Sequence, residues 1–187
     1  MPSLSEADRR TALQLARTAV VEAVTQRKIP DSFPSQGVFA ERHGVFVTLH
    51  LHNRLQGCIG VIEAKEPLGE AIARCAASAA LEDPRFAPMK TEQLGELSIE
   101  ISLLSVPEPI APESIEIGRH GLFIRLHAQR GLLLPQVAME HRLTREQFLE
   151  ETCRKAGLPR EAWRDSEARL FGFTCEVFSE TSLPERA

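Results

Sequence analysis

Apolar residues recur at helical spacing near the start of the chain. The residues that would share this helix face are Leu13, Ala16, Val20 and Val24. A serine followed three residues later by an acidic residue is typical of a helix start, and the chain offers two such pairs, Ser3 with Glu6 and Ser5 with Asp8. We therefore expect a helix that begins at one of these serines and continues to about Arg27.

Strict alternation of apolar and polar residues predicts two half-buried strands. Residues 44–52 place valine and leucine on one face and Thr48, His50 and His52 on the other. Residues 97–103 alternate leucine and isoleucine with two serines and Glu100. Between these segments, the turn 52–54 and the run 55–62 predict the returning strand of a hairpin.

The rest of the chain predicts further short elements. We expect a helix after Pro67 that ends at Asp83-Pro84, and another between the capping box of Thr144 with Gln147 and the helix-terminating Gly157. We also expect a hairpin over 115–126 that turns at 118–121, a short strand at 131–134, and a last strand containing Phe171, Phe173, Cys175 and Val177.

The order of these elements indicates an α+β fold. Most strands follow one another without an intervening helix, which favours antiparallel sheets with flanking helices. Pro107, Pro109 and Pro112 indicate a stiff connector between strands.

Composition narrows the class of protein. The chain has 187 residues, of which 43% are hydrophobic and 26% charged, as in an ordinary globular domain or two small subdomains. A net charge of −4 argues against non-specific nucleic-acid binding. The sequence has no apolar run of membrane-spanning length and no signal-peptide pattern at its start, so we expect a cytoplasmic protein without membrane partners.

Cysteine usage points to reduced thiols. The four cysteines are Cys58, Cys75, Cys153 and Cys175. Their wide, irregular spacing contains no CxxC pair, which argues against a structural zinc site. In a cytoplasmic protein such cysteines are reduced by default.

Gly57-Cys58-Ile59-Gly60 interrupts a predicted strand. Glycines weaken a strand, so two of them around a cysteine indicate a bulge or the close approach of another backbone or a ligand. One interpretation makes Cys58 a reactive thiolate or covalent attachment point. The other makes it a small buried hydrophobic residue. The residues alone leave both open.

Two polar motifs each allow a functional and a purely structural interpretation. His50 and His52 have the spacing of two metal ligands on one strand face, but no third ligand is evident and a solvated face also explains them. The turn Gly118-Arg119-His120-Gly121 either binds an anion through Arg119 and its converging N–H groups or forms an exposed hairpin turn.

Three further segments contain residues whose role the sequence does not decide. Glu100 is either an outward charge or an acid–base carboxylate in a cleft. Gln136 is a candidate for a positioned amide, and Asp83-Pro84-Arg85-Phe86 is most simply a helix end with Phe86 packed inside. The chain has no P-loop, no GxGxxG motif and no GxSxG nucleophile elbow.

Six segments in this order resemble the AMMECR domain family. They are 55–60 (LQGCIG), 83–86 (DPRF), 99–102 (IEIS), 117–122 (IGRHGL), 131–138 (GLLLPQVA) and 152–158 (TCRKAGL), followed by Trp163. The resemblance implies a single AMMECR-type domain over residues 8–182, built as two intimately packed two-layer α+β subdomains.

The resemblance also implies a functional setting, the AmmeMemoRadiSam system, whose other members are a Memo-like protein and a radical SAM protein. It implies that the motif cysteine lies in a cleft, which points to Cys58, Glu100 and His120 as catalytic residues. The implied binding residues are Gln56, Gly57, Gly60, Arg119 and Gln136. No metal site and no cofactor are assigned to this chain, because it lacks a CxxxCxxC cluster motif.

The sequence departs from the family pattern at two positions. Gln56 stands where the family has an arginine before Gly-Cys, and Arg54 would replace that arginine on the same face of a regular strand. Leu143 stands where the family often has a tryptophan, a change expected to affect packing only.

Two functional hypotheses follow. The first is an enzyme, or enzyme component, that uses Cys58 on a small metabolite or a modified partner, and the glycines around the cysteine favour it. The second is a non-catalytic adaptor that presents a substrate or peptide to the Memo-like and radical SAM partners. The adaptor hypothesis predicts an inert Cys58 and an exposed apolar or charged patch.

Overall fold

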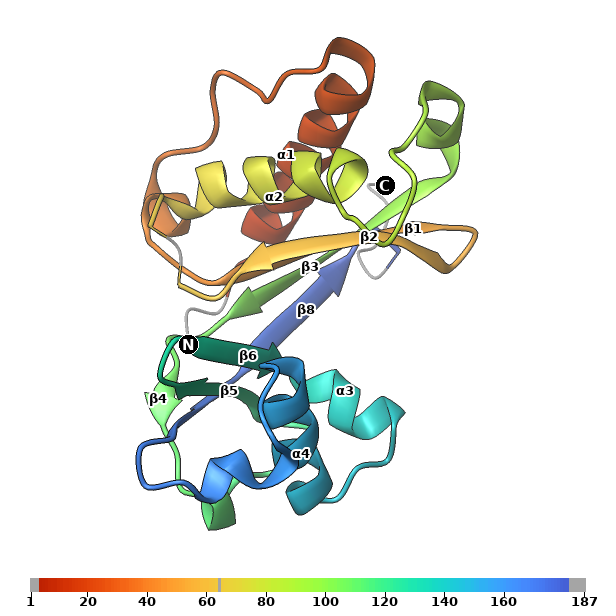
Figure 1. Cartoon of the computed structure of the whole chain (residues 1–187). Helices are drawn as coiled ribbons and strands as arrows, with labels where there is room; N and C mark the ends of the chain where they lie inside the picture. The colour runs from red at the N-terminus through yellow and green to blue at the C-terminus, as the bar shows by residue number, and fades with distance from the viewer. Residues whose placement is uncertain (1–3, 64, 182–187) are drawn as a thin grey trace. The chain divides into compact units, whose positions relative to one another are not determined.

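The computed structural model describes residues 4–63 and 65–181 (Figure 1). Within this part the chain forms two compact units. We call residues 4–103 with 176–181 the N-terminal unit and residues 104–175 the central unit. Helices and antiparallel strand pairs occur in both, which confirms the α+β class.

Helix α1 (Glu6–Gln26) begins with a capping box. The Ser5 hydroxyl accepts a hydrogen bond from the Asp8 N–H at 3.1 Å, and the Asp8 carboxylate accepts one from the Ser5 N–H at 3.3 Å. The pair Ser5 with Asp8 is therefore confirmed as the helix start, while Ser3 lies outside the described residues. The apolar face predicted for this helix is buried.

The N-terminal unit contains a four-stranded sheet in the order β2-β1-β3-β8. Its strands are β1 (Val45–Leu51), β2 (Arg54–Val61), β3 (Leu97–Leu104) and β8 (Cys175–Ser179). Val45, Val47 and Leu49 are fully buried against the helices, so the predicted alternation in β1 is confirmed. The opposite face carries the polar side chains of the same strand.

A tight turn joins β1 to β2, as predicted. His52 and Asn53 have φ values of 51° and 60°, which suit a two-residue turn between antiparallel strands. The register shifts between Leu49 and His50, where Gln56 is the extra residue of a bulge in β2.

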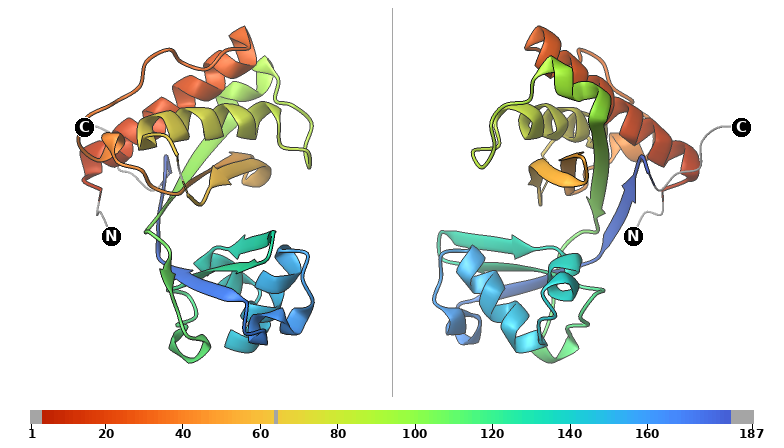
Figure 2. Two further views of the ribbon diagram at one scale, coloured as in Figure 1. Left: turned by 60° about the vertical axis from the view of Figure 1, so that its left-hand side comes forward. Right: turned by 90° about the vertical axis from the view of Figure 1, so that its right-hand side faces the viewer.

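Helix α2 (Leu68–Leu81) packs with α1 on one face of this sheet (Figure 2). Pro67 takes the N-cap position, and the helix ends before Asp83-Pro84, as expected. The short helices η1 (Gly37–Ala40) and η2 (Thr91–Glu96) lie in the connections to β1 and β3.

The central unit contains a second four-stranded sheet in the order β4-β7-β5-β6. Its elements are β4 (Glu108–Pro109), η3 (Pro112–Ser114), β5 (Gly121–Leu126), β6 (Gln129–Leu133), α3 (Pro135–Glu140), α4 (Arg145–Lys155), η4 (Arg160–Arg164) and β7 (Arg169–Phe173). Helix α4 packs on β5 and β6 (Figure 2) and buries Phe148, Leu149 and Cys153.

Two strand predictions are wrong. The turn at 118–121 lies before β5, where the Arg119 and His120 N–H groups donate to the Glu116 carbonyl. The hairpin is formed by β5 and β6, which pair with each other. The predicted last strand is two strands in different sheets, β7 and β8, which are separated by Thr174. Strand β4 and helix α3 were not predicted from the sequence.

Among the residues that the structure describes, no helix combines the length and apolar character that a membrane span requires.

Candidate functional site

Cys58 lies in the edge strand β2, and its backbone is held from outside the sheet. The Cys58 N–H donates to the Asp83 carboxylate at 2.9 Å, and the Cys58 carbonyl accepts from the Arg85 guanidinium at 3.3 Å. Asp83 and Arg85 belong to the loop after α2. This loop therefore occupies the free edge of β2 at the cysteine, where an unpaired strand edge would otherwise be open.

Asp83 and Arg85 also form an ion pair with each other. The Arg85 side chain donates to the two Asp83 carboxylate oxygens at 3.0 and 2.7 Å, a bidentate arrangement. Asp83 is only 5% exposed. The hydrogen bonds from the Arg85 side chain, helped by the N–H groups of Cys58 and Arg85, outweigh burial and hold the pKa of Asp83 well below its usual range.

Neither Asp83 nor Arg85 was predicted from the sequence to lie beside Cys58. The predicted helix end at Asp83-Pro84 is confirmed, but Phe86 is only half-buried. A carboxylate and an arginine two residues apart are visible in the sequence. Their hydrogen bonds to Cys58 in β2 cannot be predicted from the sequence.

Thr48 lies between Cys58 and Glu100 in the register of three strands. It pairs with Cys58 on β2 and with Glu100 on β3, so the three side chains share the sheet face that points away from the helices. The Thr48 hydroxyl donates to the Cys58 sulfur at 3.3 Å. Two strand spacings put the backbones of Cys58 and Glu100 roughly 10 Å apart.

Cys58, Thr48 and Glu100 form a row across three strands, and a polar pocket of about 210 Å³ adjoins this row at Glu100, within the N-terminal unit. It is lined by His50, Asn53, Ser98, Glu100, Ser179 and Thr181. His50 follows Thr48 by two residues and occupies the same face of β1. The sheet face therefore offers a thiol, a hydroxyl, a carboxylate and an imidazole.

His52 does not share the strand face of His50, contrary to the predicted arrangement. β1 ends at Leu51, and the His52 Nε2 contacts a Glu96 carboxylate oxygen at 2.5 Å from the turn. No group of three His, Cys, Asp or Glu side chains suited to hold a metal ion occurs within residues 4–63 and 65–181.

The two glycines of the motif are explained by close packing. A Cβ at Gly57 would lie 2.1 Å from the carbonyl oxygen of Ala79 in α2, so the expected close approach of another backbone is confirmed there. A Cβ at Gly60 would lie 2.3 Å from the ring of Phe46. These contacts account for both glycines without a ligand.

Gln56 and Arg54 do not form the expected regular edge. The Gln56 amide donates to the Ala87 carbonyl at 3.0 Å, which ties the bulge to the loop after α2. The bulge interrupts the two-residue alternation between Arg54 and Gln56. Arg54 was expected to replace the family arginine only if the strand were regular, and the bulge shows that it is not.

The other candidate residues belong to the central unit. In the turn before β5, the Arg119 guanidinium contacts both Glu116 carboxylate oxygens at 2.9 and 3.0 Å, and the His120 Nδ1 accepts from the Glu116 N–H at 3.0 Å. Gln136 lies in the first turn of α3 and is half-buried. The structure thus brings Cys58 and Glu100 onto one sheet face and assigns His120, Arg119 and Gln136 to the other unit.

The four cysteines differ in accessibility, and all are free thiols. Cys75 and Cys153 are fully buried, whereas Cys58 and Cys175 are partly exposed. Burial raises the pKa of Cys75 to about 11 and also raises the pKa of Cys153. Buried neutral thiols of this kind are poor nucleophiles.

Comparisons with known proteins agree with the sequence motifs. The family model described as AMMECR1 matches residues 13–178. A protein of Methanothermobacter thermautotrophicus is 43% identical over 95% of this chain and 96% of its own, and a protein of Thermoplasma acidophilum is 42% identical over 90% and 85%.

A solved structure extends the agreement to the fold. The crystal structure of an uncharacterised protein from Pyrococcus horikoshii matches with a TM-score of 0.83 and 39% identity, and the match covers 92% of this chain and 91% of that one. The names of these three relatives state no activity. On the family model, the relatives and the fold together, this chain belongs to the AMMECR1 family.

Proposed function

We propose that this protein is an enzyme component that uses the Cys58 thiol as a nucleophile on a small polar substrate, alongside Memo-like and radical SAM partner proteins. The observation that carries the proposal is the double anchoring of the Cys58 backbone by Asp83 and Arg85 at the sheet edge. It holds the sulfur on the sheet face away from the helices. A fixed nucleophile lowers the entropic cost of reaching a reactive geometry.

The surroundings of the sulfur include a hydrogen-bond donor and a cationic group. The Thr48 hydroxyl donates to Sγ, and the Arg85 guanidinium lies against the same residue. The pKa of Arg85 is raised chiefly by its hydrogen bond to Asp83, and Cys58 contributes to the rise. A cationic group and a hydrogen-bond donor beside a cysteine are the usual means of activating it.

The substrate would occupy the polar pocket beside this row. A molecule held by Glu100, Ser98 and His50 can extend past Thr48 to the Cys58 sulfur, across roughly two strand spacings. The Cys58 sulfur would attack a carbonyl carbon of the substrate, forming a carbon–sulfur bond while the C=O π bond breaks and its electron pair moves to the oxygen. The thiol proton would pass to Glu100 or His50 and then to that oxygen. Glu100 and His50 are the groups on this face that can accept or return a proton.

A non-catalytic adaptor is the second candidate. It is favoured by the contacts of Gly57, Gly60 and Gln56, which packing explains without any chemistry. In this case Asp83 and Arg85 serve only to close the strand edge, and Cys58 is inert in the folded protein.

Alkylation of the native protein separates the two candidates. With Cys175→Ser as the background, iodoacetamide near neutral pH should modify Cys58, located by peptide mass mapping, and leave the buried Cys75 and Cys153 unmodified. Labelling of Cys58 only after unfolding in urea would reject the nucleophile and leave the adaptor. Co-elution of the purified protein with purified Memo-like and radical SAM proteins tests the partners, and separate elution would contradict them.

A further inference from the structure

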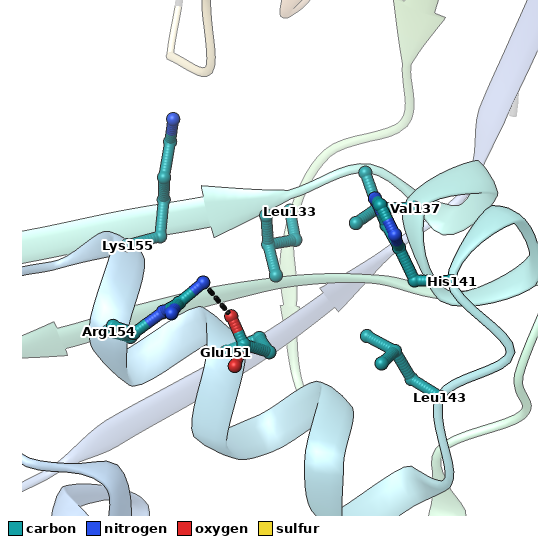
Figure 3. A pocket seen from close by; sticks show the side chains of 7 residues that line it. All are labelled: Leu133, Val137, His141, Leu143, Glu151, Arg154 and Lys155. Carbon is teal, nitrogen blue, oxygen red and sulfur yellow. Dashed lines mark ion pairs between the residues drawn. The ribbon is translucent and has the colours of Figure 1, made fainter.

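The central unit contains a second pocket, of about 700 Å³, which the Cys58 proposal does not use. It is lined by Leu133, Val137, His141, Leu143, Glu151, Arg154 and Lys155 (Figure 3). Its volume falls within the range of roughly 300–1,000 Å³ that is typical of small-molecule sites. The lining residues come from β6, α3, the loop that follows α3, and α4.

Local backbone geometry builds the walls of this pocket. A Cβ at Gly131 would lie 2.5 Å from the backbone nitrogen of Ala156, so glycine lets β6 lie directly against the end of α4. After α3, Arg142 adopts a φ of 51° and the Leu143 N–H returns to the Ala138 carbonyl at 2.9 Å. This turn places His141 and Leu143 on the pocket wall.

The floor of the pocket is apolar. Leu133, Val137 and Leu143 are partly buried and pack on the core that contains Phe148 and Leu149. Their outer surfaces remain open to the pocket. An apolar group bound there would bury its surface and theirs, which is the main source of affinity for such ligands.

The charged side chains at the rim of the pocket sum to a positive charge. The rim carries Arg154 and Lys155 against the single carboxylate of Glu151, with His141 as a further titratable group, in a chain of net charge −4. The Arg154 guanidinium contacts the Glu151 carboxylate at 2.6 Å (Figure 3). Figure 3 shows Lys155 extending away from the other lining side chains at the rim.

We propose that this pocket binds a small amphipathic anion, a carboxylate attached to an apolar chain or ring. The apolar part lies on Leu133, Val137 and Leu143, and the carboxylate binds Arg154 at the cationic rim that Lys155 shares. The pair with Glu151 is evidence that Arg154 is placed to take a carboxylate from this side. The ligand then competes with Glu151 for the guanidinium.

Calorimetric titration of the full chain with octanoate tests the proposal, with acetate and octanol as probes that lack the apolar chain and the charge. Octanoate should bind saturably to one site. Acetate and octanol should each bind about tenfold more weakly or not at all, since each loses one of the two kinds of contact. Equal binding of octanol, or no saturable binding of octanoate, would overturn the proposal.

Variants at the rim make the test specific to this pocket. Arg154→Gln and Lys155→Gln, both at exposed positions, should weaken octanoate binding about tenfold. Glu151→Gln should strengthen binding because it removes the competing carboxylate, and Leu143→Trp should abolish it by filling the pocket. Arg160→Gln, an exposed arginine that pairs with Glu150 outside the lining, is the matched control. Unchanged binding in both Leu143→Trp and Arg154→Gln would contradict the site.

Discussion

The backbone N–H of Cys58 donates to the carboxylate of Asp83 at 2.9 Å, across 25 residues of chain. Helix α2 lies between the two in sequence, so the bond closes the loop after α2 onto the edge of the sheet. Arg85 completes the arrangement by binding both Asp83 and the Cys58 carbonyl. The reactive cysteine of the proposal and the stability of the N-terminal unit therefore depend on the same carboxylate.

Asp83→Asn should destabilise the protein. The amide keeps one hydrogen-bond acceptor but loses the charge that binds Arg85, so we expect the free energy of unfolding at neutral pH to fall by about 1–3 kcal/mol. Urea denaturation of both proteins measures this difference. Asp31→Asn, at an exposed carboxylate paired with Lys28, is the control and should change little.

The effect of Asp83→Asn should depend on pH. The pKa of Asp83 is lowered on folding from its ordinary value of 3.8, so its charge stabilises the fold above that value and the stabilisation is lost as the pH falls below it. The gap in unfolding free energy between wild type and Asp83→Asn should therefore narrow below about pH 4. A gap that stays constant down to the acid transition would show that the ion pair does not contribute.

Gly57→Ala should be strongly destabilising. The added methyl group would meet the Ala79 backbone, which cannot move without shifting α2, so we expect a loss of about 2–3 kcal/mol or more. Gly95→Ala is the matched control, because nothing lies within 4 Å of the Cβ it would add. Thermal unfolding of the two variants measures the contrast, and equal melting temperatures would contradict the close approach of α2.

Thr144→Ala should loosen the start of α4. The Thr144 hydroxyl accepts from the Gln147 N–H at 3.3 Å, and the Gln147 side chain accepts from the Thr144 N–H at 2.9 Å. Loss of such a cap costs about 1 kcal/mol. Thr144→Ser keeps the hydroxyl and should restore most of the stability in denaturant unfolding. Equal losses in both variants would mean that the cap is not the cause.

Features set by neighbouring residues were predictable from the sequence. The cap at Thr144, the turn at His52 and Asn53, and the alternation in β1 all follow from local hydrogen bonding and side-chain periodicity. The segment containing Phe171 and Val177 was not predictable as two strands. Its alternation continues through Thr174, and only pairing with distant strands assigns its halves to different sheets.

The candidate site was predictable only in part. Cys58 and Glu100 were identified from their motifs, and the register of β1 explains why they share one face. The contacts of Asp83 and Gln56 were not identified, because they join β2 to a loop that folds back after a helix. The packing against Gly57 also depends on that helix, and no local pattern reveals it.

Thr48→Val should slow the alkylation of Cys58. Valine has nearly the same shape as threonine but cannot donate to the sulfur, so Sγ loses its hydrogen bond from the Thr48 hydroxyl. We expect the rate at fixed pH to fall about three- to tenfold while the fold is retained. Thr25→Val, in α1, is the control, since that hydroxyl donates to the Val21 carbonyl of its own helix. Equal alkylation rates in wild type and Thr48→Val would show that Thr48 does not contribute to the reactivity of Cys58.

The most direct test of the central claim is the rate at which Cys58 reacts with iodoacetamide in the folded Cys175→Ser protein, compared with glutathione at the same pH. We expect Cys58 to react faster than the free thiol, and Arg85→Met to lose most of the advantage, because the guanidinium that anchors the Cys58 backbone is gone. A Cys58 that reacts only when the protein unfolds, or whose rate is unchanged by Arg85→Met, would contradict an activated thiol at this site.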